Sequence, residues 1–354
     1  MKCTTVIGAR PQFIKVAPIS RAFAAAGIEQ VLVHTGQHYD SKMSEVFFRE
    51  LEIPLPRHSL GLGGGTHGAM TGRMLEGIEK ILLEDRPDWV LVFGDTNSTL
   101  AGALAATKLH IPVCHVEAGL RSWNRRMPEE INRVLTDHVS DRLFCSSEPG
   151  VENLRREGIT VGVEMVGDVM ADTNKLAQEV IAGRSAEFLQ TATPEMLADE
   201  FALLTLHRAE NTDDPVRFRA LVQQLNNLDI RVVFPVHPRT HKALEREGLS
   251  LGAHIFTIDP VGYLEMVLLL DKARLVLTDS GGLQKEAYWS RTPCLTLRTE
   301  TEWVETVETG WNVVLGDKVE SLSSMVDAVT EPPSWEPLYG DGNAAGRIVA
   351  ALST

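Results

Sequence analysis

Short apolar runs alternate with segments of helical periodicity along most of the chain. Residues 89–93 (WVLVF) are apolar at every position, which is typical of a parallel strand covered on both faces. Segment 71–84 has its apolar residues at helical spacing instead: Met74, Leu75, Ile78, Ile81 and Leu82. Repeated alternation of such strands and helices predicts an α/β fold with doubly wound parallel sheets.

The alternation occurs twice, which predicts two nucleotide-binding-type halves. The expected strands of the first half are 2–7, 30–34, 89–93, 112–116 and 142–146, with a helix after each of the first four. The expected strands of the second half are 201–206, 231–235, 255–258, 273–277 and 294–297. A weakly patterned, polar stretch at 172–200 is expected to connect the halves, and 343–352 is expected to be a final helix.

Composition narrows the class of protein. The chain has 354 residues, of which 44% are hydrophobic and 23% charged, and no run approaches the ~18 apolar residues of a membrane helix. The N-terminus is patterned as a strand rather than a signal peptide, so we expect a cytoplasmic protein with no membrane partner. The formal charge of −14 argues against nucleic acid as a partner.

Four cysteines lie in or beside apolar strands, without a CxxC pair or zinc-like spacing. They are Cys3, Cys114, Cys145 and Cys294. We therefore expect buried free thiols rather than metal ligands or a disulfide.

Residues 278–287 (TDSGGLQKEA) follow the apolar run 273–277 and are expected to open a helix. The unpaired amides of Gly281 and Gly282, with the Ser280 hydroxyl, could hold a diphosphate at this helix N-terminus. Glu286 lies about one turn further on, where its carboxylate could accept the hydroxyls of a ribose. The alternative is a capped helix whose glycines permit close packing.

Other polar residues follow predicted strands, at the sheet edge where ligands bind in doubly wound folds. They are Arg10, Asp95, Glu117, His207 and His237, with Lys15 about one helical turn after Arg10. Each has a structural alternative, since Asp95 could cap a helix and either histidine could be a core residue. Glu117 is harder to explain structurally, because a buried carboxylate needs a cation or a proton.

Residues 127–133 are expected to open a helix in which Pro128 is followed by Glu129 and Glu130. The helix dipole would explain at least one of these acids. Neither a P-loop nor a GxGxxG fingerprint is present, so NAD-dependent hydride transfer is not expected. Together, the predicted cradle, the arginine and the carboxylates indicate a nucleoside diphosphate sugar as ligand.

The motifs that carry these residues resemble the non-hydrolysing UDP-N-acetylglucosamine 2-epimerases. The matching stretches are Gly8-Ala9-Arg10-Pro11, Gly36-Gln37-His38, Gly94-Asp95-Thr96, 115–121 (HVEAGLR), 128–133 (PEEINR), Val166-Gly167-Asp168, 206–211 (LHRAEN), His237-Pro238, 259–264 (DPVGYL) and 278–287. The resemblance implies a glycosyltransferase-B architecture, in which two Rossmann-like doubly wound domains face a cleft. It also implies a homodimer, no metal or redox cofactor, and a C-terminal helix that returns to the first domain. We therefore expect domains at 1–170 plus 341–354 and at 171–340.

By the same resemblance, Asp95, Glu117, Glu129 and His207 match catalytic positions. The UDP-binding positions are matched by Arg10, Ser280, Gly281, Gly282 and Glu286, and we add Lys15 and His237 as substrate-binding candidates. The family is thought to eliminate UDP, giving a 2-acetamidoglucal, and to add UDP back after reprotonation of C2 from the other face.

The stretch around Trp303 is most similar to the branch that acts on UDP-2,3-diacetamido-2,3-dideoxyglucuronate, whereas enzymes acting on UDP-N-acetylglucosamine usually have arginine at this position. A uronate carboxylate would need an extra cation, for which Arg121, Arg125, Arg126 and Lys15 are candidates. Either UDP-sugar therefore remains a candidate substrate. The competing functions are a hydrolysing 2-epimerase, a UDP-sugar glycosyltransferase of the same fold, and a nucleotide-sugar sensor without activity.

Overall fold

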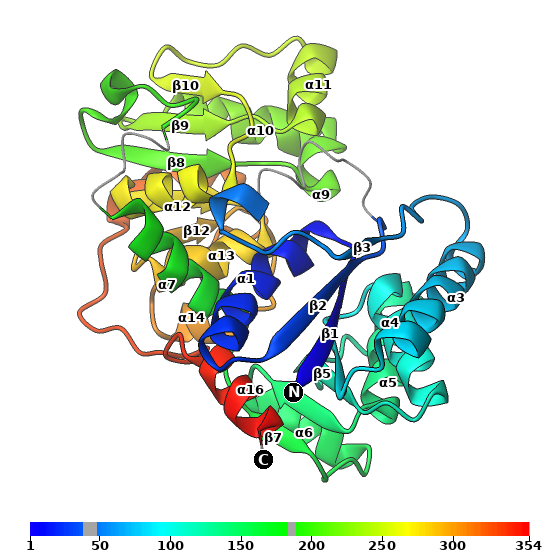
Figure 1. Ribbon diagram of the computed structural model, residues 1–354. Coiled ribbons are helices and arrows are strands. Elements are labelled where there is room, and N and C mark those ends of the chain that lie inside the picture. Colours follow the sequence, from blue (N-terminus) through cyan, green and yellow to red (C-terminus); the bar gives the residue numbers. More distant parts are fainter. Residues whose placement is uncertain (38–47, 183–188, 354) are drawn as a thin grey trace. The chain divides into compact units, whose positions relative to one another are not determined.

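The computed structural model describes residues 1–37, 48–182 and 189–353. The chain forms two compact units, one of Met1–Leu176 with Tyr339–Thr354 and one of Ala177–Leu338. Figure 1 labels their helices and strands. The helix expected after strand 30–34 falls largely on residues 38–47, and His38 of the Gly36-Gln37-His38 motif is also outside the described residues.

The first unit is built on a seven-stranded parallel sheet in the order β3-β2-β1-β4-β5-β6-β7. Its strands are β1 (Lys2–Ile7), β2 (Glu29–His34), β3 (His58–Ser59), β4 (Trp89–Phe93), β5 (Val113–Ala118), β6 (Arg142–Cys145) and β7 (Val163–Met165). The short strands β3 and β7 at the two edges were not predicted. With two or three residues each, they carry too little periodicity to be recognised.

The described helices that cover this sheet are α1 (Arg10–Ala25), α3 (His67–Asp85), α4 (Asn97–Lys108), α5 (Pro128–Val139), α6 (Glu148–Arg156), α7 (Val169–Ile181) and α16 (Ala344–Leu352). Helices α3, α4 and α5 pack side by side on one face, and α1 packs with α16 on the other (Figure 1). The predicted apolar face of α3 is confirmed, because Met74, Ile78 and Leu82 are fully buried against the sheet. Asp172 of α7 accepts hydrogen bonds from the Ala344 and Ala345 amides, so the last helix of the chain is tied into this unit.

The second unit is built on a six-stranded parallel sheet in the order β10-β9-β8-β11-β12-β13. Its strands are β8 (Phe201–Thr205), β9 (Arg231–Pro235), β10 (Ile255–Ile258), β11 (Leu275–Thr278), β12 (Cys294–Thr296) and β13 (Asn312–Val314). Its described helices are α9 (Ala209–Thr212), α10 (Pro215–Asn226), α11 (Pro238–Glu247), α12 (Tyr263–Lys272), α13 (Gly281–Trp289), α14 (Val304–Glu308) and α15 (Leu322–Ala328), with 3₁₀ turns η1 (Pro194–Leu197) and η2 (Val319–Ser321).

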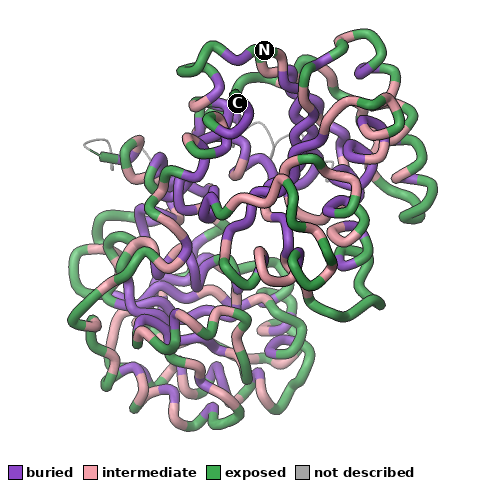
Figure 2. The backbone as a smooth tube through the Cα atoms, turned by 90° about the horizontal axis from the view of Figure 1, so that it is seen from below, coloured by how far each residue is buried: buried purple, intermediate pink, exposed green. Residues whose placement is uncertain are grey.

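Strand β8 illustrates why the strand runs are continuously apolar. Ala202 and Leu204 belong to the core on one face of the sheet, whereas Phe201 and Leu203 belong to the core on the other. Figure 2 shows buried residues in the interior of each unit, with exposed residues on the outer segments of the tube. The predicted α/β class with two doubly wound sheets is therefore confirmed.

Both sheets reverse their strand order at one point, where helices change from one face to the other. This point lies between β1 and β4 in the first sheet and between β8 and β11 in the second. In open α/β sheets, ligands bind beyond the carboxyl ends of the strands at such a switch point. The fold therefore gives each unit one preferred place for a ligand.

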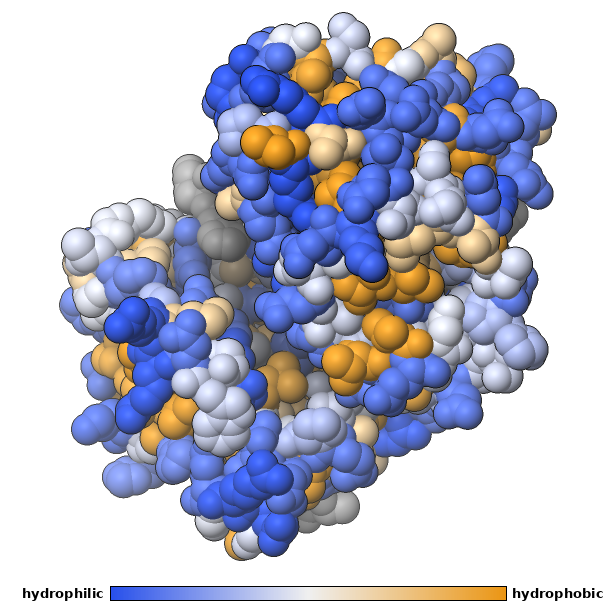
Figure 3. Space-filling model, turned by 180° about the vertical axis from the view of Figure 1, so that it is seen from behind, coloured by the Kyte–Doolittle hydropathy of each residue, from blue (hydrophilic) through white to orange (hydrophobic). Residues whose placement is uncertain are grey.

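Among the residues that the structure describes, no helix is long and apolar enough to cross a membrane. The face shown in Figure 3 is mostly hydrophilic, with apolar side chains in patches between polar ones. All four cysteines are free and buried, as predicted, and burial raises the pKa of Cys3 and Cys294 to about 12.

Candidate active site

Glu117 lies at the end of β5 in an unusual backbone conformation. Its φ is +68°, in the left-handed region that non-glycine residues seldom adopt, and the pairing of β5 with β6 shifts register between Val116 and Ala118. The Glu117 carboxylate forms an ion pair with Lys15 Nζ from α1. Burial alone would lower the pKa of Lys15, but the Glu117 carboxylate outweighs this effect and holds the pKa above its ordinary value. The pair is therefore a carboxylate and an ammonium ion.

Asp95 follows β4, next to β5 in the sheet, so the ends of the two strands bring Asp95 and Glu117 to the same edge. The Asp95 carboxylate forms an ion pair with Arg133 of α5, and the Asp95 carbonyl accepts a hydrogen bond from Asn132 Nδ2 at 2.9 Å. Thr96, and not Asp95, is the N-cap of α4. The alternative that Asp95 is present as a helix cap is therefore wrong.

The two acids at the start of α5 have different environments. Glu130 is buried and accepts hydrogen bonds from the Ser122 and Trp123 amides, both at 2.9 Å, while Glu129 is exposed. Burial alone would raise the pKa of Glu130, but these hydrogen bonds and Arg133 hold the pKa below its ordinary value. Glu130 therefore fixes the loop before α5, which leaves Glu129 as the acid that can meet a ligand.

Arg10 begins α1 at the switch point of this sheet and is exposed. Gln12 holds the turn before it, since Gln12 Oε1 accepts from the Gly8 and Ala9 amides at 2.8 and 3.0 Å. Its Nε2 donates to the Phe93 carbonyl of β4 at 2.9 Å. A buried side chain that sequence analysis did not single out thus joins the two strand ends at the switch point.

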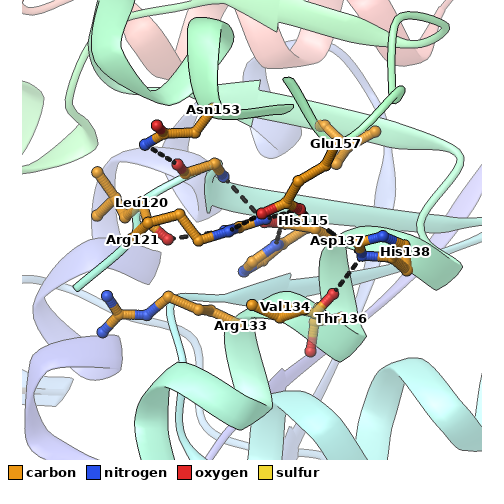
Figure 4. Close-up of polar contacts among 12 residues, drawn as sticks. His115, Leu120, Arg121, Arg133, Val134, Thr136, Asp137, His138, Asn153 and Glu157 are labelled. Carbon is orange, nitrogen blue, oxygen red and sulfur yellow. Dashed lines mark hydrogen bonds and ion pairs between the residues drawn. The ribbon is translucent and has the colours of Figure 1, made fainter. Parts of the chain in front are cut away.

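A buried network lies directly beneath these residues (Figure 4). His115 contacts Asp137 of α5 and the Gly94 carbonyl, both at 2.7 Å. Arg121 donates to Asp137 at 2.7 Å and binds both carboxylate oxygens of Glu157, and its side chain is fully buried. Arg121 is therefore not a cation for a substrate carboxylate, because its buried guanidinium is already paired with two acids, Asp137 and Glu157. The adjacent candidates Arg125 and Arg126 are exposed.

In the second unit, Asp279 at the end of β11 organises the switch point. Its carboxylate, which is fully buried, accepts from the His207 and Arg208 amides and from Asn211 Nδ2, at 2.8 to 3.1 Å. It also lies 3.2 Å from His207 Nδ1. Burial alone would raise the pKa of Asp279, but these hydrogen bonds hold the pKa below its ordinary value. A carboxylate in this place orients the His207 ring through Nδ1, which leaves Nε2 for a ligand.

His237 follows β9 and lies beside His207, with the two ring centroids 5.4 Å apart. His237 Nδ1 accepts from the Arg239 amide and caps α11. Helix α11 was not predicted, because only Thr240 and Ala243 of its residues are buried and its sequence shows no apolar periodicity. The two histidines are therefore neighbours at the switch-point edge rather than core residues.

The predicted cradle residues open α13. Ser280 is the N-cap, and its hydroxyl oxygen accepts from the Leu283 amide at 3.4 Å. The alternative that this stretch begins a capped helix is therefore correct for Ser280. Gly281 is buried, Gly282 is exposed and Glu286 is half-buried. Trp303 Nε1 donates to the Gly281 carbonyl at 2.8 Å, and the Trp303 ring lies 4.2 Å from Lys285 Nζ. Trp303 thus lies against the first turn of this helix.

The structure therefore groups the candidates into two sets. Arg10, Lys15, Asp95, Glu117 and Glu129 lie on elements at the switch-point edge of the first sheet; His207, His237, Ser280, Gly281, Gly282 and Glu286 lie at that of the second. Sequence analysis assigned no role to Arg133 or Asp279, although Asp279 directly follows a buried strand, which is a usable signal. Within the described residues, no group of three or more His, Cys, Asp or Glu side chains is placed to hold a metal ion.

Two doubly wound units with polar groups at both switch points define a protein of the nucleotide-binding α/β class. The family model for UDP-N-acetylglucosamine 2-epimerase matches residues 21–353, and the chain belongs to this family. The predicted family is thus confirmed.

Individual relatives agree over the full length. The chain is 51% identical over 367 residues to the UDP-2,3-diacetamido-2,3-dideoxy-D-glucuronate 2-epimerase of Pseudomonas aeruginosa, covering 100% of this chain and 99% of the relative. It is 44% identical to the UDP-N-acetylglucosamine 2-epimerase of Methanocaldococcus jannaschii, with coverage of 100% and 99%. The crystal structure of the M. jannaschii enzyme in complex with UDP-GlcNAc and UDP matches with a TM-score of 0.82 at 44% identity, over 100% of this chain and 99% of that one.

Proposed function

We propose that the chain is a non-hydrolysing 2-epimerase that inverts C2 of a UDP-2-acetamido sugar. One observation carries the proposal: Asp95 and Glu117 lie at the ends of neighbouring strands, each ion-paired with a basic side chain, at the switch point of a chain from the 2-epimerase family. Proton transfer at a weakly acidic carbon needs acids and bases held in place, and each such group contributes about 10²- to 10⁴-fold to the rate.

The reaction would proceed by elimination and re-addition. A carboxylate removes the C2 proton, the C–H electron pair forms the C1–C2 double bond, and the C1–O bond breaks to release UDP. A proton is then delivered to C2 on the opposite face while the UDP oxygen bonds again to C1. Asp95, Glu117 and Glu129 would share the two proton transfers, and Lys15 and Arg133 would hold the Glu117 and Asp95 side chains in place.

The second unit would bind and stabilise UDP. The N-terminus of α13 offers amides and a partial positive charge to the diphosphate, and His207, oriented by Asp279, offers a hydrogen-bond donor to it. Glu286 would accept the ribose hydroxyls, and His237 and Arg10 would add contacts to the nucleotide.

The diacetamido uronate is the substrate that we favour. The P. aeruginosa relative that carries this name shares 51% identity over the full chain. For a C5 carboxylate we favour Arg125 and Arg126 as the cations. Both are exposed, and both lie in the loop that Glu130 fixes.

Proton NMR in heavy water tests the function directly. The purified protein is incubated separately with UDP-N-acetylglucosamine and with UDP-2,3-diacetamido-2,3-dideoxyglucuronate. We expect a mixture of C2 epimers, with deuterium at C2, from the uronate and little or none from the other sugar. Free sugar plus UDP would identify a hydrolysing enzyme, and a sugar left unchanged until an acceptor is added would identify a glycosyltransferase. No change in either sugar, despite UDP binding, would identify a sensor.

Assembly and location belong to the same proposal. The family resemblance supports a homodimer, and a nucleotide-sugar substrate supports a cytoplasmic enzyme. Light scattering at micromolar concentration should give twice the mass of one chain, and a monomer mass would contradict the homodimer.

A further inference from the structure

His115 is fully buried between two hydrogen-bond acceptors. Its Nδ1 lies 2.7 Å from Asp137 Oδ1, and its Nε2 lies 2.7 Å from the Gly94 carbonyl oxygen. A carbonyl oxygen cannot donate, so Nε2 must carry a hydrogen. The second oxygen of Asp137 already accepts from Arg121 at 2.7 Å and from the Gly119 amide at 3.1 Å. His115 therefore bridges the Gly94 carbonyl and a carboxyl group that two other groups hold in place.

Asp137 connects three elements, each of which carries a candidate catalytic acid (Figure 4). Through His115 it reaches Gly94, the residue before Asp95. Asp137 also accepts from the Gly119 amide and so holds the turn that contains Glu117. The Gly119 carbonyl accepts a hydrogen bond from Asn153 Nδ2 at 3.0 Å. Asp137 itself lies on α5, two turns after Glu129. Asp137 and His115 together thus link the three elements that carry Asp95, Glu117 and Glu129.

The turn after β5 needs such support. Glu117 and Gly119 both have positive φ, +68° and +81°, and the first of these conformations is strained for a residue with a side chain. A strained residue keeps its conformation only where its neighbours hold it. His115 precedes the strained residue by two positions, and Gly119 follows it by two.

We propose that His115 is a positioning residue, held between Asp137 and the Gly94 carbonyl, that fixes the turns carrying Asp95 and Glu117 relative to each other. It acts through the placement of the two acids. Its effect on turnover rests on the proposed epimerase function, but its contacts with Asp137 and Gly94 do not.

Kinetics test the positioning role. In His115→Gln the side chain is neutral and can satisfy only one of the two acceptors as a donor. We expect kcat to fall about 10- to 100-fold, the loss that a misplacement of about 1 Å produces, while the Kd for UDP changes by less than about 2-fold. The matched control is His138→Gln, which alters an exposed histidine beside Asp137 on the same helix and should keep the wild-type kcat. A wild-type kcat in His115→Gln, an equal loss in the control, or a loss of UDP affinity in proportion to kcat would overturn the proposal.

The bridge has an independent test that needs no variant. In wild-type protein with ¹⁵N-labelled histidine, one buried ring should carry a slowly exchanging hydrogen on Nε2, the nitrogen that donates to the Gly94 carbonyl. A His115 ring without hydrogen on Nε2 in the wild type would overturn the proposal, even if His115→Gln failed to fold. If instead the wild type epimerised neither sugar, the proposed function would fail and the nitrogen signals would still decide the contacts of His115.

Discussion

Asp137 and Asp279 are both fully buried carboxylates near the switch point of a parallel sheet, yet they take their hydrogen bonds from different groups. Asp137 is bound by two basic side chains, His115 and Arg121, and one amide, whereas Asp279 is bound mainly by backbone amides and Asn211, with His207 at its edge. In the first unit the candidate groups at the switch point are carboxylates, and basic side chains pair with them and with the carboxylate beneath. In the second unit the proposed anion site consists of N–H groups, and backbone amides also satisfy the buried carboxylate. The buried carboxylate of each unit thus takes its hydrogen bonds from the kind of group that surrounds its switch point.

The largest effect should come from removing a carboxylate of the first unit. Glu117→Gln and Asp95→Asn should each lower kcat by about 10²- to 10⁴-fold, because neither amide can accept or deliver the C2 proton. UDP affinity should stay within about 2-fold of the wild type, since the second unit supplies the diphosphate site. Initial rates by NMR and titration calorimetry with UDP provide the two values. Glu164→Gln, which removes a half-exposed carboxylate on β7, is the control and should behave as wild type.

The turn after β5 should be intolerant of a side chain at Gly119. An added Cβ would lie 2.2 Å from the Gly150 carbonyl oxygen, and the φ of +81° is itself unfavourable for alanine. Gly119→Ala should therefore lower the free energy of unfolding by about 3 kcal/mol or more. Urea unfolding measures this loss, and a stability within about 1 kcal/mol of the wild type would show that the turn is not rigid.

A smaller loss is expected at the anion-binding side. Asp279→Asn would place an amide NH₂ or a weaker acceptor against the His207 and Arg208 amides, and should cost about 1–3 kcal/mol of stability. It should also weaken UDP binding, because His207 loses the carboxylate that orients its ring. Asp213→Asn, at an exposed pair with Arg239, is the matched control. Equal UDP affinity in Asp279→Asn and wild type would show that Asp279 does not contribute to UDP binding.

Acid should destabilise both units through these same residues. The pKa values of Asp137 and Asp279 are below ordinary in the folded chain, while the unfolded value is about 3.9. Their contribution is therefore fully present above about pH 5 and is lost as the pH falls through the folded pKa values. The stability gap between wild type and Asp279→Asn should shrink between about pH 5 and pH 2. A gap that stays constant over this range would mean that Asp279 does not titrate on unfolding.

The smallest effect should be that of Gly282→Ala. Here the added Cβ meets only the Ser280 hydroxyl at 3.9 Å, so stability should not change measurably. If the first turn of α13 holds a diphosphate, the methyl group should weaken UDP binding several-fold by crowding the ligand, an effect of about 1 kcal/mol. An unchanged Kd for UDP would argue against the cradle at this glycine. Compared with Gly119→Ala, this variant separates a glycine required by the fold from one required by a ligand.

Much of the architecture was predictable because its cause is local. A parallel strand covered on both faces must be apolar throughout, which is why residues 89–93 are recognisable as a strand. Helix α3 must bury one face, which is why the helical spacing of Met74, Ile78 and Leu82 predicts it. Helices α6 and α11 escaped prediction because they bury few apolar residues, and edge strands β3 and β7 because they are too short. The sequence also located most candidate site residues, since polar groups directly after strands must meet at one edge of a sheet.

What each of those residues does was decided by contacts between distant parts of the chain. No local pattern distinguishes Glu129 from Glu130, and only the Ser122 and Trp123 amides show that Glu130 is structural. The sequence made Arg121 a candidate for substrate binding, but its guanidinium is buried and paired with Asp137 and Glu157. The sequence by itself determined the strand and helix types and the chemical groups available at the strand ends, because these follow from side-chain polarity and spacing. The tertiary structure decided which charges neutralise one another and which remain for a ligand, because pairing depends on distance in space and burial, and neither is encoded by position along the chain.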